Sequence, residues 1–193
     1  QWEGRICLRS SQSVYNQSLV AATIDALGAE ATQAWMQGMV NNLAKAPAGG
    51  DTDQLKAVAA GVCDVTLANT YYLARLINSS KSADQTTASK LGVFWPNQQG
   101  AGGRGAHFNV SGAGLTKYGK HPEQARALLE YLASDPAQAW YADINNEYPV
   151  VEGVTISSTL EGFGAYKMDP IALEILGQNN RQAVQLMDRA GWR

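Results

Sequence analysis

In the stretch Asn69-Thr70-Tyr71-Tyr72-Leu73-Ala74-Arg75, a polar pair separates two adjacent tyrosines from an apolar run at residues 62–68. The apolar run predicts a buried strand, and Leu73, Leu76 and Ile77 have the spacing of a helix that begins at once. In open α/β sheets the cleft at the strand ends commonly binds ligands. The two tyrosines are therefore either core aromatics or a pair of phenol groups directed at a ligand.

The composition is that of a globular protein, long enough for one large domain or two small ones. Of the 193 residues 45% are hydrophobic. No apolar run reaches the roughly 20 residues of a membrane span. The formal charge is −2 with acids and bases interleaved, whereas nucleic-acid binding favours a basic face. We therefore expect neither an integral membrane protein nor a nucleic-acid partner.

The two cysteines, Cys7 and Cys63, each lie in a predicted buried strand. They are either two small core side chains or one disulfide between neighbouring strands. A disulfide would suit an oxidising compartment such as the periplasm. Their spacing alone does not distinguish these alternatives, and neither cysteine belongs to a Cys-x-x-Cys metal pattern.

The order of predicted elements indicates an α/β fold with a mostly parallel sheet. Strands are expected at residues 5–9, 62–68, 91–95 and 106–110. Helices are expected at residues 14–27, 30–45, 70–77 and 122–133, and others begin at Asp51, Asp135 and Asp169. Residues 78–90 are polar and predict a loop, and glycine-rich residues 98–105 predict a flexible crossing.

Enzyme signatures are scarce, and we expect a protein that is not an enzyme. The sequence has no Gly-x-Ser-x-Gly, no His-Glu-x-x-His and no Gly-Lys-Ser/Thr phosphate loop. Its two histidines are too few for most zinc chemistry. His107 is interpreted as a packing residue of a strand, and His121 as a residue at a helix start.

Three tyrosines have the same location relative to the predicted elements. Each follows a strand end and lies at or near a helix start: Tyr15, Tyr71 and Tyr72. Parallel strands put these ends at one edge of the sheet, so the hydroxyl groups can converge. A phenol loses its proton at about pH 10, so a phenolate at neutral pH needs a strongly positive partner. Three phenolates formally neutralise a trivalent ion, which favours ferric iron, Fe3+, over Mg2+ or Ca2+.

At these residues the chain resembles the periplasmic ferric-ion-binding proteins of iron ABC importers, and most of all their cyanobacterial, tyrosine-rich branch. The resemblance extends along essentially the whole chain. The matching pieces are Arg9-Ser10-Ser11, Val14-Tyr15-Asn16-Gln17-Ser18-Leu19, Ala68-Asn69-Thr70-Tyr71-Tyr72, Asn109-Val110-Ser111-Gly112-Ala113-Gly114 and Leu186-Met187-Asp188-Arg189-Ala190-Gly191-Trp192.

The resemblance implies a function for the three tyrosines. It implies that Tyr15, Tyr71 and Tyr72 are metal ligands, and that the protein binds Fe3+ in the periplasm and delivers it to an ABC importer permease. The alternative is a binding protein for an organic or oxyanion solute, in which the tyrosines stack on the ligand or hydrogen-bond to it.

The resemblance also implies a periplasmic-binding-protein-like fold of class II, with two hinged lobes that close on the ion. Residues 1–101 would form the C-terminal lobe, and residues 102–152 would cross the hinge and complete the N-terminal lobe. Residues 153–193 would return to the C-terminal lobe. The other ligands of the family, a histidine and commonly a tyrosine, come from an N-terminal segment without a counterpart here. We therefore expect the chain to be the C-terminal part of a longer protein.

Further polar residues near the tyrosines have two interpretations each. Arg9 and Arg104 either hydrogen-bond the phenolates or an accompanying anion, or are solvated surface arginines. Ser10, Ser11 and Ser13 either form an anion-binding nest at the helix start or cap the helix.

Overall fold

Two short parallel strands, β1 (Ile6–Cys7) and β2 (Val65–Thr66), join the two stretches of chain that precede the tyrosines. The computed structural model describes residues 2–100 and 102–193. Ile6 pairs with Val65, and Cys7 pairs with Thr66. Because the strands are parallel, the residues that follow them leave the ladder at the same edge.

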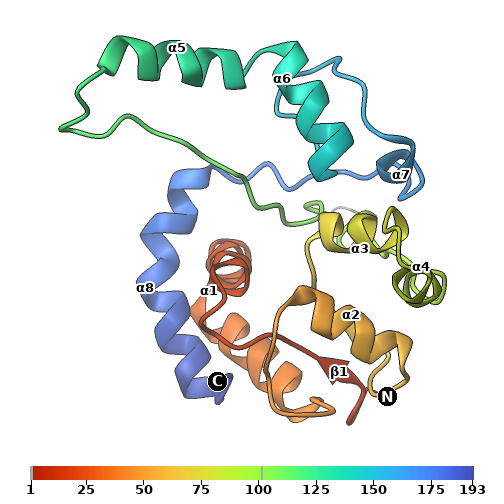
Figure 1. The fold of residues 1–193 in the computed structure, drawn as a ribbon. Coiled ribbons are helices and arrows are strands. Elements are labelled where there is room, and N and C mark those ends of the chain that lie inside the picture. Colours follow the sequence, from red (N-terminus) through yellow and green to blue (C-terminus); the bar gives the residue numbers. More distant parts are fainter. Residues whose placement is uncertain (1, 101) are drawn as a thin grey trace.

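Helices form most of the remaining regular structure (Figure 1). In chain order they are α1 (Val14–Asn41), α2 (Asp51–Ala59), α3 (Thr70–Ile77), α4 (Ser82–Ala88), α5 (Pro122–Leu132), α6 (Asp135–Trp140), α7 (Ser158–Glu161) and α8 (Leu173–Ala190). A π-helical turn at Tyr141–Asn145 continues α6. Across the described ranges, every helix is too short or too polar to cross a membrane.

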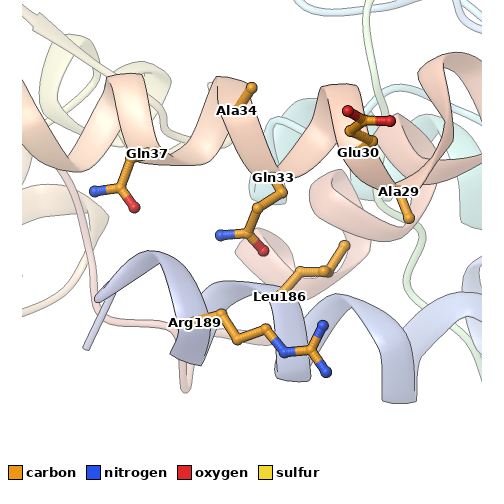
Figure 2. Close-up of a pocket in the computed structure, with 7 residues that line it drawn as sticks. All are labelled: Ala29, Glu30, Gln33, Ala34, Gln37, Leu186 and Arg189. Atoms are coloured by element: carbon orange, nitrogen blue, oxygen red, sulfur yellow. The ribbon is translucent and has the colours of Figure 1, made fainter.

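The main core lies between α1 and α8, which run side by side (Figure 1). Trp192 is fully buried after α8, and its indole N–H donates to the carbonyl of Arg9 at 2.8 Å. This bond holds the chain just after β1 against the core. A pocket between α1 and α8 is lined by Ala29, Glu30, Gln33, Ala34, Gln37, Leu186 and Arg189 (Figure 2).

The helix α1 consists of two segments joined at Gly28, where φ is 78° and ψ is 166°. A positive φ favours glycine because the residue has no Cβ. The prediction that one helix ends at Gly28 and a second follows is therefore confirmed. The second segment returns Trp35, Met36 and Met39 to the same core.

Cys7 and Cys63 form a disulfide, with their Cα atoms 5.9 Å apart. Both side chains are buried, and Ala44, Ala57 and Val58 pack around them. The bond ties β1 to the segment that leads into β2. The interpretation of the two cysteines as a disulfide is therefore confirmed, and their interpretation as two unpaired core side chains is wrong.

Two extended segments, one after α4 and one before α8, connect the outlying helices α5 and α6 with the rest of the fold (Figure 1). The segments meet where Ala106 and Met168 form a parallel bridge. The N–H of Ala106 donates to Lys167 at 2.9 Å, and the N–H of Asp169 donates to Ala106 at 3.0 Å. A Cβ at Gly105, where φ is 103°, would lie 2.5 Å from the Met168 carbonyl carbon. Glycine is thus required at this crossing.

The apolar side of α5 and α6 is uncovered within the described ranges. None of the α5 residues is buried, and the exposed fractions of Leu128 and Tyr131 are 56% and 59%. Trp140 and Ile144 are each 56% exposed. A patch of this kind commonly marks a surface that another element covers.

The division of the chain into lobes at residues 101 and 152 stays a prediction.

Several local predictions are wrong. Residues 91–95 and 106–110 form no strand apart from the bridge at Ala106, because no neighbouring strand lies beside them among the described residues. Trp95 instead stacks on Tyr166, with ring centroids 4.0 Å apart. Residues 78–90, predicted as a loop, contain α4, whose Ala88 packs in a second apolar cluster.

The predicted helix starting at Asp169 begins later, at Leu173. The N–H of Asp169 bonds to Ala106 in the crossing, so this residue is held in an extended conformation. The strands predicted at residues 5–9 and 62–68 are confirmed, but each is reduced to two paired residues.

Candidate functional site

The hydroxyl groups of Tyr15 and Tyr71 lie 3.1 Å apart, although 56 positions separate the two residues. Tyr15 lies in the first turn of α1, and Tyr71 and Tyr72 lie in the first turn of α3. The ring centroids of Tyr71 and Tyr72 are 4.2 Å apart. All three side chains are half-buried. The structure thus brings together the three tyrosines that the sequence singled out.

Burial raises the pKa of the Tyr71 phenol above its usual range, and the neighbouring Tyr15 and Tyr72 raise it further. Two negative phenolates at this separation would repel each other, so Tyr71 keeps its proton at neutral pH. A multivalent cation reverses this preference, because it stabilises the anionic oxygens and displaces their protons. The cluster is suited to a highly charged cation.

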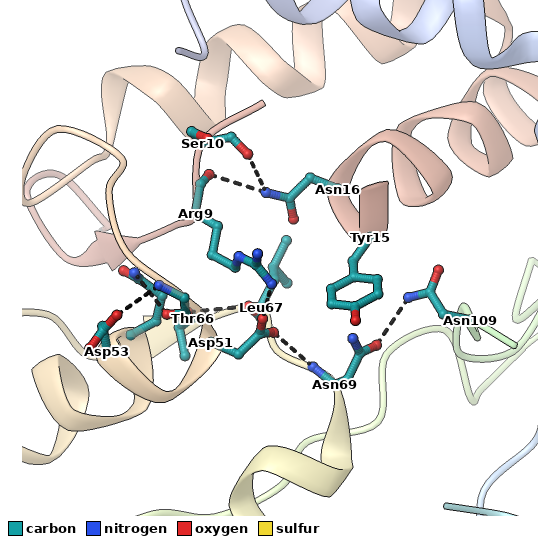
Figure 3. Close-up of polar contacts among 12 residues, drawn as sticks. Arg9, Ser10, Tyr15, Asn16, Asp51, Asp53, Thr66, Leu67, Asn69 and Asn109 are labelled. Carbon is teal, nitrogen blue, oxygen red and sulfur yellow. Dashed lines mark hydrogen bonds and ion pairs between the residues drawn. The ribbon is translucent and has the colours of Figure 1, made fainter. Parts of the chain in front are cut away.

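Arg9 forms an ion pair with Asp51 beside the tyrosines (Figure 3). Its guanidinium carbon lies 5.3 Å from the Tyr15 ring centroid. Burial lowers the pKa of Arg9, but the hydrogen bond and the charge of Asp51, together with Tyr72 and Tyr15, raise it overall. Because its side chain is only 24% exposed, the interpretation of Arg9 as a solvated surface arginine is wrong.

Arg104 does not contact the tyrosines as one prediction suggested. Its Nη1 donates to the carbonyl of Ala22 at 2.9 Å, and its Nε lies 3.4 Å from a carboxylate oxygen of Asp169. The Arg104 side chain is 25% exposed and Asp169 is buried, so the surface interpretation is also wrong. Arg104 ties the crossing segments to α1.

The serines before α1 act mainly through their backbone. The carbonyls of Ser10 and Ser11 accept hydrogen bonds from the side chains of Asn16 and Gln17, at 3.1 and 2.9 Å. Ser13 occupies the N-cap position, but its side chain makes no capping bond. The N–H of Asn16 bonds to the Ser13 carbonyl instead, at 3.0 Å. The capping prediction is therefore wrong for the Ser13 hydroxyl, and the anion nest stays a prediction.

The two histidines lie where the sequence suggested packing and a helix start. His121 directly precedes α5. His107 contacts the hydroxyl of Ser18 through Nε2 at 2.9 Å, and burial lowers its pKa to about 4. His107 is therefore neutral at physiological pH and belongs to the packing around α1.

Sequence reasoning missed three polar residues next to the tyrosines. The N–H of Asn69 donates to Asp51 at 3.1 Å, and its side-chain oxygen accepts from Asn109 at 3.0 Å. The Asn69 amide nitrogen is buried and without a partner in the described part of the chain. Of the three, Asp51 and Asn109 had no local signal, because their contacts join distant positions. Asn69 itself stands before a predicted helix, where a polar residue is expected as a cap.

A fourth residue next to the tyrosines is Arg75, which belongs to the same stretch of sequence as Tyr71 and Tyr72. Its guanidinium carbon lies 4.8 Å from the Tyr71 ring centroid and 5.8 Å from that of Tyr72. Residues four apart on a helix share a face, so the spacing of Tyr71 and Arg75 is the local signal from which this contact could have been predicted. The tyrosines thus lie between two positively charged side chains, Arg9 and Arg75.

Substituting Asp51 with alanine is expected to destabilise the fold by about 2 kcal/mol, less than for a fully buried pair because water reaches Arg9. The change leaves the Arg9 charge without its partner and removes the acceptor for the N–H of Asn69. Urea unfolding measures the loss. Asp25→Ala, at an exposed position of α1, is the matched control. Equal midpoints for the two variants would contradict this assignment.

A short parallel ladder, two crossing segments and polar groups gathered at the strand ends surround the tyrosine cluster. The chain belongs to the bacterial extracellular solute-binding protein family, whose model matches residues 1–161. This membership confirms the expected periplasmic-binding-protein-like α/β fold class.

Two proteins of Synechocystis sp. PCC 6803 are similar along the whole chain. Iron uptake protein A1 is 46% identical over 193 residues, and iron uptake protein A2 is 47% identical over 192 residues. The Fe(3+)-binding periplasmic protein of Serratia marcescens is 26% identical over 191 residues. The match covers 53%, 55% and 53% of these relatives, respectively, and 100%, 100% and 99% of this chain. The chain thus spans about half the length of the curated relatives it matches.

Solved structures agree with these relatives. Trichodesmium IdiA (FutA) in complex with iron and citrate ligands matches with a TM-score of 0.94 and 49% identity. The ferric binding protein from Campylobacter jejuni matches with a TM-score of 0.94 and 35% identity. Both matches cover 100% of this chain and 60% of the other. The resemblance to ferric-ion-binding proteins, with cyanobacterial relatives among them, is confirmed.

Proposed function

We propose that the chain binds Fe3+ through the phenolate oxygens of Tyr15, Tyr71 and Tyr72, in the periplasm, for delivery to an ABC importer permease. The observation that carries this proposal is the 3.1 Å separation of the Tyr15 and Tyr71 hydroxyls, with the Tyr72 ring next to Tyr71. The extracellular solute-binding family and the relatives named for iron uptake support the periplasmic location and the importer as parts of this proposal.

The charge of the site matches a trivalent cation. Three phenolates and one Fe3+ sum to zero, and the charge of Arg9 is already neutralised by Asp51. The charge of Arg75, beside the Tyr71 ring, is additional and exposed to solvent. Phenolate is a hard anionic ligand, whereas Mg2+ and Ca2+ are commonly held by carboxylate and carbonyl oxygens. Among the described residues no group of three or more histidine, cysteine or carboxylate side chains could hold a metal ion. The tyrosine cluster is therefore the place in the described chain where a cation is best accommodated.

Titration with ferric citrate tests the proposal. We expect a visible phenolate-to-iron charge-transfer band that saturates at one iron per chain. Because burial raises the pKa of Tyr71, its proton must leave when iron binds. Iron binding therefore releases protons and weakens as the pH falls below neutral, which a pH-stat titration measures.

Citrate without iron is the control for this titration. A band that fails to form at saturating iron would contradict the proposal. The alternative function, binding of an organic or oxyanion solute, predicts that citrate alone raises the melting temperature and that EDTA leaves this increase unchanged. Iron binding predicts that EDTA removes both the band and the stabilisation.

A further inference from the structure

One extended stretch, residues 104–109, contacts both helices that carry the tyrosines; we call it the bridging segment. Arg104 donates to the carbonyl of Ala22 in α1 at 2.9 Å. His107 lies 2.9 Å from the hydroxyl of Ser18, also in α1. Asn109 donates to the side-chain oxygen of Asn69, directly before α3, at 3.0 Å. The bridging segment thus connects α1 with the start of α3. In the sequence, α1 ends at Asn41 and α3 begins at Thr70, with 28 residues between them.

The contacts on α1 lie on the same side of the helix as Tyr15. Positions 15 and 18 are three residues apart, which puts their side chains on one helical face, and the Ala22 carbonyl that accepts from Arg104 lies about one turn beyond Ser18. At α3 the contact reaches Asn69, whose own N–H is held by Asp51. Asn69 precedes Tyr71 by two positions, and Figure 3 shows its side chain hydrogen-bonded to Asn109. The bridging segment therefore acts on both helices close to the point where the hydroxyls meet.

The bridging segment is itself held in place. Ala106 pairs with the crossing segment at Met168, and Arg104 forms an ion pair with Asp169. Gly105 leaves no space for a Cβ against the backbone of Met168. A segment fixed in this way can set the position of what it touches, whereas a mobile loop could not.

We propose that His107 and Asn109 are positioning residues of the tyrosine site. Through Ser18 and Asn69 they set α1 and α3 relative to each other, and with them the spacing of the Tyr15 and Tyr71 hydroxyls. This inference rests on the proposed function. Groups that directly hydrogen-bond a metal ligand change metal affinity by about 10–100-fold when they are removed. Because His107 and Asn109 act through one further residue, we expect effects at the lower end of this range.

The test uses the intact chain and three readouts: iron affinity by chelator competition, the wavelength of the charge-transfer band, and the urea midpoint. His107→Ala and Asn109→Ala are each expected to weaken Fe3+ binding by about tenfold and to shift the band. His107→Gln, which keeps a nitrogen that can reach Ser18, is expected to restore both. Ser18→Ala should reproduce His107→Ala, and combining the two should add nothing further.

Ser111→Ala is the matched control, because the Ser111 hydroxyl donates to Glu147 at 3.0 Å. Its affinity and band should equal those of the unmodified chain. Asn109 is exposed, so its variant is expected to fold even if His107→Ala does not. Unchanged affinity and band in Asn109→Ala, or an affinity loss that follows the urea midpoint while the band stays in place, would overturn the positioning roles. If the unmodified chain forms no band, the proposed function itself fails.

Discussion

Tyr71→Phe is expected to remove most of the charge-transfer band and to lower Fe3+ affinity by more than the roughly 100-fold of an outer-shell change. Tyr71 is central to the cluster, since its oxygen lies 3.1 Å from that of Tyr15 and its ring lies against that of Tyr72. Phenylalanine keeps the ring and removes only the oxygen. The substitution therefore lowers iron affinity and leaves the packing in place, so the free energy of unfolding should change by about 1 kcal/mol or less.

Three further phenylalanine variants make this prediction specific. Tyr15→Phe and Tyr72→Phe are expected to weaken iron binding in the same direction, and each should release one proton fewer per bound iron. Tyr118→Phe is the control, because Tyr118 is 85% exposed and lies far along the chain in an open segment. A Tyr71→Phe protein that binds iron with unchanged affinity and colour would place the ion elsewhere.

Replacing both Cys7 and Cys63 with alanine is expected to lower the free energy of unfolding by about 4 kcal/mol, from the chain entropy of the closed loop. The two residues are 56 positions apart, so the disulfide removes much freedom from the unfolded chain. Urea unfolding of the variant and of the oxidised protein measures the difference.

The disulfide prediction also has a functional part. Cys7 is two residues before Arg9, and the Cys63 segment leads to Asn69, so the bond braces both approaches to the tyrosines. Iron affinity of the folded variant is nevertheless expected to stay within about tenfold, because the bridging segment and the Arg9–Asp51 pair remain. Reduced and alkylated protein serves as the comparison. A midpoint unchanged by reduction would contradict a stabilising role.

Helix ends marked by glycine or proline were predictable from local sequence. The end of the first helical segment at Gly28 and the start of α5 at Pro122 both match the structure. Glycine adopts the positive φ that ends a helix, and proline suits its first turn, so each signal acts within a few residues. The strand predictions at residues 91–95 and 106–110 were wrong because a strand depends on a neighbour that local sequence does not reveal.

The tyrosine cluster was predictable in kind, because Tyr15, Tyr71 and Tyr72 each stand after a strand and at a helix start. The role of Arg104 was not, since its partners Ala22 and Asp169 lie 82 and 65 positions away. The same holds for Arg9, which the sequence left between two interpretations and which the contact with Asp51 places beside the cluster.

By itself the sequence determined most of the longer helices and that three phenols stand at helix starts, because propensity, capping and apolar spacing act over a few neighbouring positions. It did not determine α4 or the first residue of α8. Only the tertiary structure decided whether the two cysteines pair, where Arg9 is neutralised and how residues 104–109 connect α1 with α3. These contacts join side chains 40 to 89 positions apart. Their partners are selected by packing of the whole chain, and no local pattern encodes that choice.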